Sequence, residues 1–170
     1  MFRRCGGWKL TMQGRKYLIY DVFADTALSG NPLAIVLDGE GLEAQAMQRI
    51  AREFNLSETV FVLPAEQPQH RARLRIFTPD YEMPFAGHPT VGAAVALAEQ
   101  AGNGASILVL EENIGPVRCA VPSGGGFAEF DLAKLPERLQ FSLESEAVGA
   151  ALGLGPHEVG FENHRVSFWS

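Results

Sequence analysis

Residues 88–101, with the sequence HPTVGAAVALAEQA, constrain the fold more than any other part of the chain. The centre of this segment is apolar on every side, and most of its side chains are small. A helix with no polar face to turn toward water is a buried helix. Pro89 suits the first turn, where its missing N–H has no helical partner to lose, and Gly102 marks the end. The sequence therefore predicts a central helix that other elements surround closely.

Short segments rich in β-branched and aromatic residues occur on both sides of that helix in the chain. Turn-forming Gly, Pro, Asn and Asp separate them, which is typical of strands. We expect strands at residues 17–24, 33–37, 59–63, 72–78, 107–111, 117–121 and 127–132. Strands and helices do not alternate regularly, which argues against a parallel doubly wound sheet. The predicted fold class is α+β, with a curled, mostly antiparallel, β-barrel-like sheet wrapped around the central buried helix.

The remaining segments predict surface elements and loops. Residues 42–55 place apolar side chains on one face at helical spacing, and Asn55 suits the C-terminal end of such a helix. Turn residues predict a tight loop at residues 29–32, and Pro and Gly punctuate a loop at residues 78–87. Arg71, Arg73 and Arg75 alternate with apolar residues, as on the solvent face of a half-buried strand.

The domain organisation is expected to have three parts. Residues 1–16 have no structural pattern and are interpreted as a disordered leader, with Met12 as an alternative start. Residues 17–140 form the barrel-and-helix domain. Residues 141–170 contain a linker helix near 144–152 and a strand starting at Val166, which we interpret as the beginning of a truncated second domain. The apolar face left by such a truncation would favour self-association as a homodimer.

Composition excludes several functional classes. The 14 basic and 20 acidic side chains give a net charge of −6, which argues against a nucleic-acid partner. No apolar run approaches the length of a membrane span, so no membrane partner is expected. The two cysteines, Cys5 and Cys119, can form neither a disulfide framework nor a four-ligand metal site. A reducing, cytoplasmic location is expected, and Cys119 is interpreted as a small buried hydrophobe.

The candidate site lies at the start of the buried helix. Unpaired N–H groups at a helix N-terminus attract anions, and Gly87 would let a ligand approach the backbone next to His88. The alternative is that Gly87 serves only a turn and His88 only a cap. Glu58 stands at the edge of the apolar strand 59–63, where loss of hydration can adapt a carboxyl group to acid/base catalysis. Glu82 is a rival for that role.

Three segments together make a more specific pattern: SGNPLAIV at 29–36, NLSETVFV at 55–62 and RIFTPDYEMPFAGHPTVGAA at 75–94. In this order and spacing they resemble the N-terminal half of the phenazine-biosynthesis PhzF-like family, which is similar in fold to diaminopimelate epimerase. The resemblance implies two similar domains, each a barrel around a central helix, with the active site between them. It also implies isomerisation of a dihydro-hydroxyanthranilate, a small carboxylate-bearing substrate, without metal or organic cofactor.

The resemblance assigns roles to individual residues. Glu58, in the NLSET motif, is implied to be the acid/base that takes up and returns a proton. Gly87 and His88 of the GHPT motif are implied to line the site and hold the substrate carboxylate, with Pro89 and Thr90 beside them. Asn31 of the GNP loop is expected to border the same cleft. Neither cysteine has the context of the cysteine bases in related epimerases, so the chain resembles the glutamate branch.

Three functions remain open from the sequence. The first is a PhzF-like isomerase of which this chain, taken alone, is expected to be inactive because one wall of the site is missing. The second is a noncatalytic domain that binds a small anion at Gly87 and His88. The third is an amino-acid epimerase or racemase on the same fold, against which the cysteine context argues.

Overall fold

The computed structural model describes residues 14–102, 104–140, 143–160 and 167. The chain divides into two compact units, Met1–Ala133 and Lys134–Ser170. The predicted leader falls almost wholly on residues 1–13, which lie outside the described residues. The elements of the first unit, in chain order, are β1 (Tyr17–Val22), β2 (Asn31–Val36), α1 (Ala44–Phe54), β3 (Glu58–Leu63), β4 (Ala72–Phe77), β5 (Glu82–Met83), α2 (Gly87–Gln100), β6 (Ser106–Glu112), β7 (Gly115–Val121) and β8 (Glu129–Phe130).

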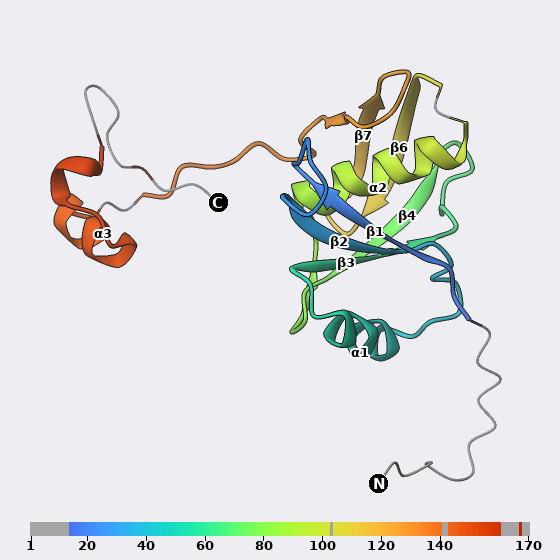
Figure 1. The fold of residues 1–170 in the computed structure, drawn as a ribbon, viewed down its shortest axis with the longest axis horizontal. Coiled ribbons are helices and arrows are strands. Elements are labelled where there is room, and N and C mark those ends of the chain that lie inside the picture. The colour runs from blue at the N-terminus through green and yellow to red at the C-terminus, as the bar shows by residue number, and fades with distance from the viewer. Residues whose placement is uncertain (1–13, 103, 141–142, 161–166, 168–170) are drawn as a thin grey trace, which may run out of the picture. The chain divides into compact units, whose positions relative to one another are not determined.

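The described strands form one eight-stranded sheet that curls around α2 (Figure 1). The strand order is β1-β2-β3-β4-β6-β7-β8, and β5 pairs with β4 outside that path. Only β2–β3 and β4–β6 are parallel among these described pairs. Each parallel pair has a helix in its connection, because parallel neighbours need a long crossover. The α+β class and the mostly antiparallel, curled sheet are therefore confirmed.

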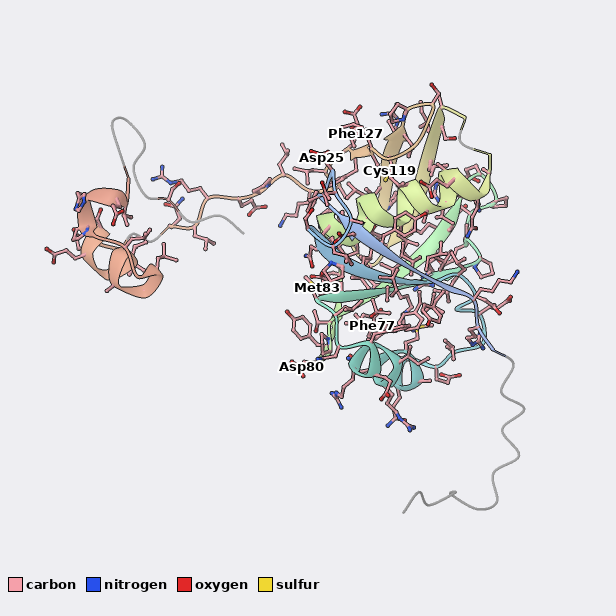
Figure 2. All side chains as sticks on the ribbon, in the orientation of Figure 1. Asp25, Phe77, Asp80, Met83, Cys119 and Phe127 are labelled. Carbon is pink, nitrogen blue, oxygen red and sulfur yellow. The ribbon has the colours of Figure 1, made fainter. Side chains whose placement is uncertain are left out.

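The central strands are buried on both faces because a helix covers each side. Successive side chains of a strand point to opposite faces, so Ile35 packs in the core on the α2 side, whereas Val36 packs on the α1 side. Phe61 and Phe77 join Val36 there, with their rings 5.5 Å apart and perpendicular. Met47 of α1 covers them, and Phe77 lies between the sheet and α1 in Figure 2. The apolar runs in β2 and β3 thus reflect two separate cores.

Helix α2 is buried along most of its length, as its uniformly apolar sequence predicts. Its small residues allow a close approach to the sheet. A Cβ atom at Gly92 would lie 2.5 Å from Leu33 Cδ2, closer than real Cβ contacts, and 3.0 Å from Val22 Cγ2, which is tighter than most. Leu33 is fully buried, and burial of such a side chain contributes about 1.5–3 kcal/mol. The glycine therefore lets helix and sheet share this core without a gap.

Two strand boundaries differ from the prediction. The segment 29–32, expected to be a loop, enters the sheet at Asn31, because β2 already pairs with β1 there. Pro32 tolerates this position since it is exposed at the start of a strand. The strand expected at 127–132 is reduced to Glu129–Phe130, which pairs with Cys119 and Ala120 of β7.

The loop expected at 78–87 contains a strand that the sequence did not indicate. Thr78 N donates to Tyr81 O at 2.9 Å, and the Thr78 hydroxyl accepts hydrogen bonds from Asp80 N and Tyr81 N. This turn returns the chain so that β5 pairs with the end of β4. A two-residue strand leaves no periodicity to read, so only the tertiary pairing reveals it.

The second unit contains α3 (Ser145–Leu152) and the 3₁₀ turn η1 (Pro156–Glu158). The helix matches the one expected near 144–152, and Gly153 ends it in the left-handed conformation. Of the strand expected from Val166 onward, the structure describes Ser167 alone, so that prediction lies outside the described residues. Within the described ranges, no helix has the length and apolar character needed to cross a membrane.

Candidate active site at the start of α2

Three chain segments far apart in sequence converge at one end of α2. Asn31 is the first residue of β2, Glu58 is the first residue of β3, and His88 lies in the first turn of α2. The parallel register pairs Leu33 with Glu58, which brings the beginnings of the two strands together. The structure thus brings together the predicted residues Asn31, Glu58 and His88.

Glu58 and His88 form a direct pair. Glu58 Oε2 lies 2.7 Å from His88 Nδ1, and the two side chains are 18% and 10% exposed, respectively. These groups are shielded, yet each keeps access to the surface. A hydrogen bond of this length in a partly dry setting is stronger than one in water. The pair is therefore held in one geometry.

The contacts of His88 determine how its protons are arranged. Nε2 lies 3.1 Å from the carbonyl oxygen of Asn31, which can only accept, so Nε2 carries a hydrogen and donates it. Nδ1 and Glu58 Oε2 then share a single proton. Either a neutral Glu58 donates it to Nδ1, or a cationic His88 donates it to the carboxylate. Such a pair can release or take up one proton without a change of position.

Asn31 is itself fixed by Ser57. The Ser57 hydroxyl donates to Asn31 Oδ1 at 3.1 Å, and Asn31 Nδ2 lies 3.4 Å from His88 Nδ1. Asn31 therefore contacts His88 through both its backbone and its side chain. Ser57 was not among the predicted site residues, although it stands in the NLSET motif next to Glu58. Its role becomes visible only when β2 and β3 lie side by side.

The loop between β1 and β2 forms a further border of the site. Asp21 holds it closed, because its carboxylate accepts hydrogen bonds from Ser29 N and Gly30 N at 2.9 and 3.0 Å. A Cβ atom at Gly30 would lie 2.3 Å from Val22 O, so this position requires glycine. Phe23 has φ 61° and is 75% exposed, with its ring centroid 6.0 Å from that of His88. The sequence gives no periodic signal for this contact.

The N-terminus of α2 offers main-chain donors beside the pair. Ala86 occupies the N-cap position and makes no side-chain hydrogen bond to the first turn. The amides of Gly87 and His88 begin the helix, so they have no partner within it. This corrects the alternative that His88 caps the helix. Pro89 and Thr90 are buried behind this turn, and their predicted contact with substrate remains a prediction.

Glu82, the rival carboxylate, is engaged elsewhere. Arg75 donates to both of its oxygens, at 2.7 and 2.6 Å, and Asn113 Nδ2 donates to Oε1 at 3.1 Å. The hydrogen bond from Arg75 lowers the pKa of Glu82 below its usual value, although burial opposes the shift. Glu82 is therefore a fixed anion that braces β4 against β5. Arg75, expected on a solvent face, is instead half-buried, because its guanidinium lies over the Phe77 ring on the side of β4 that faces α1.

Cys119 lies inside the core rather than in the site. It is fully buried on β7, and Figure 2 labels it on this strand, away from α1. Burial, followed by repulsion from Glu112 and Asp131, raises the pKa of its thiol to about 12. A thiol that keeps its proton so firmly is not a base, and the interpretation of Cys119 as a small buried hydrophobe is confirmed. Among the described residues no group of three His, Cys, Asp or Glu side chains could hold a metal ion.

Comparison with known proteins places the chain in a family. The model of the phenazine biosynthesis-like family PhzC-PhzF matches residues 20–164. An uncharacterized isomerase of Mesorhizobium japonicum is 72% identical over 162 residues, which cover 94% of this chain and 54% of the relative. A trans-2,3-dihydro-3-hydroxyanthranilate isomerase of Pseudomonas aeruginosa is 43% identical over 141 residues, or 82% and 49% of the two chains.

A solved structure agrees with this result. A predicted epimerase of Pseudomonas aeruginosa superposes with a TM-score of 0.79 at 33% identity, over 92% of this chain and 56% of the other. The chain thus spans about half the length of the relatives it matches. With a family match over most of its residues and a curled sheet around a buried helix, this chain belongs to the PhzC-PhzF family of phenazine biosynthesis-like proteins.

Proposed function

We propose that this chain supplies the acid/base half of an isomerase that moves a proton on a small carboxylate-bearing metabolite, without a cofactor. The observation that carries the proposal is the 2.7 Å contact between Glu58 and His88 at the N-terminus of α2. At this point Glu58, which can exchange a proton, lies beside the first amides of α2, which can hold an anion. The isomerase names of the relatives support the same reaction class.

The proton transfer assigns one role to each residue. Glu58, as the carboxylate, removes a proton from a substrate carbon next to a double bond, and the electron pair of that C–H bond shifts into the unsaturated system. The proton held as the Glu58 carboxylic acid then returns to a different carbon. No atom is gained or lost, so the reaction is an isomerisation. A positioned acid/base group contributes about 10²–10⁴-fold to such a rate.

The substrate carboxylate is assigned to the helix N-terminus. The amides of Gly87 and His88 and the positive end of the helix dipole favour a negative group there. His88 is fixed by Glu58 and the Asn31 carbonyl, so it lines this position without needing to reorganise. Asn31, Pro89 and Thr90 complete the proposed substrate-binding set, in which the latter two act as the buried support.

The experiment is solvent-deuterium exchange with a longer protein, in which this chain is followed by the remaining half of the Mesorhizobium japonicum relative. The substrates are trans-2,3-dihydro-3-hydroxyanthranilate, other cyclic β,γ-unsaturated amino acids and simple amino acids. We expect deuterium uptake by the longer protein and a loss of about 10²–10⁴-fold with Glu58→Gln. Glu53→Gln, on the exposed face of α1, is the matched control and should retain full exchange.

The alternatives give different results in the same experiment. If no compound exchanges, yet an anionic member of the panel binds and protects the amides of Gly87 and His88, the chain is a noncatalytic anion-binding domain. If the α-carbon of a simple amino acid exchanges with inversion, the activity is that of an epimerase or racemase. Full exchange by the Glu58→Gln protein would refute the assignment of Glu58 as the base.

We also propose a cytoplasmic location and assembly as a homodimer. A cytoplasmic setting suits the free buried thiol of Cys119, because thiols stay reduced there. Assembly as a homodimer is supported by exposed apolar side chains on the first unit, such as Ile107 and Phe127, at 66% and 59% exposure. Light scattering of the longer protein would test whether it is a homodimer.

A further inference from the structure

A carboxyl group that the proposed reaction does not use lies behind the first turn of α2. Glu112 is the last residue of β6 and is only 7% exposed. Its Oε1 lies 2.8 Å from the hydroxyl oxygen of Thr90, and its Oε2 is buried without a hydrogen-bond partner among the described residues. A buried carboxylate with one oxygen unsatisfied is costly, whereas a neutral carboxylic acid is much less so.

The Thr90 hydroxyl has two close neighbours but a single hydrogen. It lies 2.7 Å from the carbonyl oxygen of Ala86 and 2.8 Å from Glu112 Oε1. If Thr90 donates to the carbonyl, which can only accept, then Glu112 must supply the hydrogen of the second contact. The two short contacts are therefore satisfied together only when Glu112 carries its proton.

The groups around Glu112 do not offer it a counter-charge. Cys119, on the adjacent β7, is a thiol whose pKa is raised chiefly by burial, so it stays neutral. A surface cavity of about 420 Å³ is lined by Glu112 together with His70 and Arg73. Each of those basic side chains already pairs with another carboxylate of the cavity, at Glu111 and Glu66, respectively. Burial accordingly raises the pKa of Glu112 to about 7, although the Thr90 contact opposes the shift.

The chain after Glu112 reinforces the same end of α2. Ile114 N donates to Pro84 O at 3.0 Å, and Asn113 Nδ2 donates to Glu82 Oε1. The β6–β7 turn thus contacts the segment that leads into the helix. Glu112 adds a contact to the helix itself through Thr90, whose hydroxyl also lies beside the Ala86 carbonyl. Ala86 precedes His88 by two positions and Thr90 follows it by two.

We propose that Glu112 is a positioning residue of the site: its protonated carboxyl group donates to Thr90, which lets Thr90 donate to Ala86 and fixes the turn that carries His88. When Glu112 ionises, the Thr90 hydrogen turns to the carboxylate and leaves the Ala86 carbonyl. The state of one buried acid thereby controls the geometry of the turn. The inference rests on the proposed function only for the role of that turn in catalysis.

The test is a pH titration of the ¹³C,¹⁵N-labelled 170-residue chain by NMR. The reporters are the carboxyl carbon of Glu112, the carbonyl carbon of Ala86 and the amide of Thr90. We expect the Glu112 carbon to titrate near pH 7, with a step at Ala86 and Thr90 that has the same midpoint. In Glu112→Gln the step should vanish and the signals should match the low-pH wild type, because the Gln amide can donate to Thr90 without titrating.

Two Thr90 variants separate the coupling from a general structural effect. In Thr90→Val the Glu112 carbon should still titrate while Ala86 no longer follows it, and Thr90→Ser should restore the step. A Glu112 midpoint in the ordinary range of glutamate, or an Ala86 step that persists in Glu112→Gln, overturns the proposal. These readouts need no turnover, so a longer protein without isomerase activity would defeat the proposed function and leave this inference to be decided by the titration.

Discussion

The imidazole of His88 is held at both ring nitrogens by groups from two neighbouring strands. The carbonyl of Asn31 fixes one nitrogen and the carboxyl of Glu58 the other. The motifs indicate these three residues from the sequence because each stands in a distinctive local context. Ser57 shares the NLSET motif with Glu58, but its contact with Asn31 depends on strand register. The contact of Phe23 with His88 depends on a left-handed backbone, for which the sequence has no signal.

Glu112 provides a prediction about stability and pH. Its pKa is raised by burial from 4.5 to about 7, so the folded state holds the proton more firmly than the unfolded chain. The protonated Glu112 therefore contributes its full stabilisation of the folded state below pH 4.5, and this stabilisation is lost as the pH rises through about 7. The Glu112→Gln protein has no such carboxyl group to ionise. The difference in free energy of unfolding, Glu112→Gln minus wild type, should therefore rise by roughly 3 kcal/mol from below pH 4.5 to above pH 7.

Denaturant unfolding of both proteins at pH 4 and pH 8, on either side of the two pKa values, would measure that difference. Glu53→Gln is the matched control, because it makes the same substitution at an exposed position of α1. A Glu112→Gln difference that stays constant would mean that Glu112 titrates alike in the folded and unfolded chain.

At the level of elements, α2 makes the core and the site interdependent. Its buried body fixes the helix against β1 and β2 through Gly92, while its first turn presents Gly87 and His88 beside Glu58. Uniform hydrophobicity is a strong signal, so the sequence predicts this helix within one residue. Because every side of the helix is apolar, however, the sequence does not indicate which of its residues face which strand.

Gly92→Val is expected to destabilise the protein by about 1–3 kcal/mol, because the added side chain would overlap Leu33 and Val22 in a filled core. Thermal or denaturant unfolding would measure the change. Gln100→Val, at an exposed position of the same helix, should have a much smaller effect since it adds the same side chain without overpacking. Equal losses at both positions would show that valine disfavours this helix regardless of packing.

At the scale of the whole molecule, the chain corresponds to about half of its relatives. Glu58 and His88 are 18% and 10% exposed with this half alone. Catalysis by proton transfer gains from a fixed substrate and from exclusion of water, and both require walls on more than one side of the site. We therefore expect the proposed activity from a protein of the length of these relatives.

The 170-residue chain alone is expected to turn over the substrate of the longer protein at least about 10³-fold more slowly, because substrate positioning is lost. Single-turnover deuterium exchange at equal concentrations would measure the ratio. The Glu58→Gln form of the longer protein gives the background rate. Exchange by the short chain at the rate of the longer protein would contradict the need for a second half.

The sequence by itself determined the elements whose signals are local: the buried helix, the amphipathic α1 ending at Asn55, most strands, and Glu58 and His88 in their motifs. Tertiary structure decided the entry of Asn31 into β2, the short strand β5 and the burial of Glu112. These features depend on which strands become neighbours, and on which hydrogen-bond partners and how much water each side chain then meets. No periodicity or local preference encodes such long-range contacts, so they emerge only when the chain is folded.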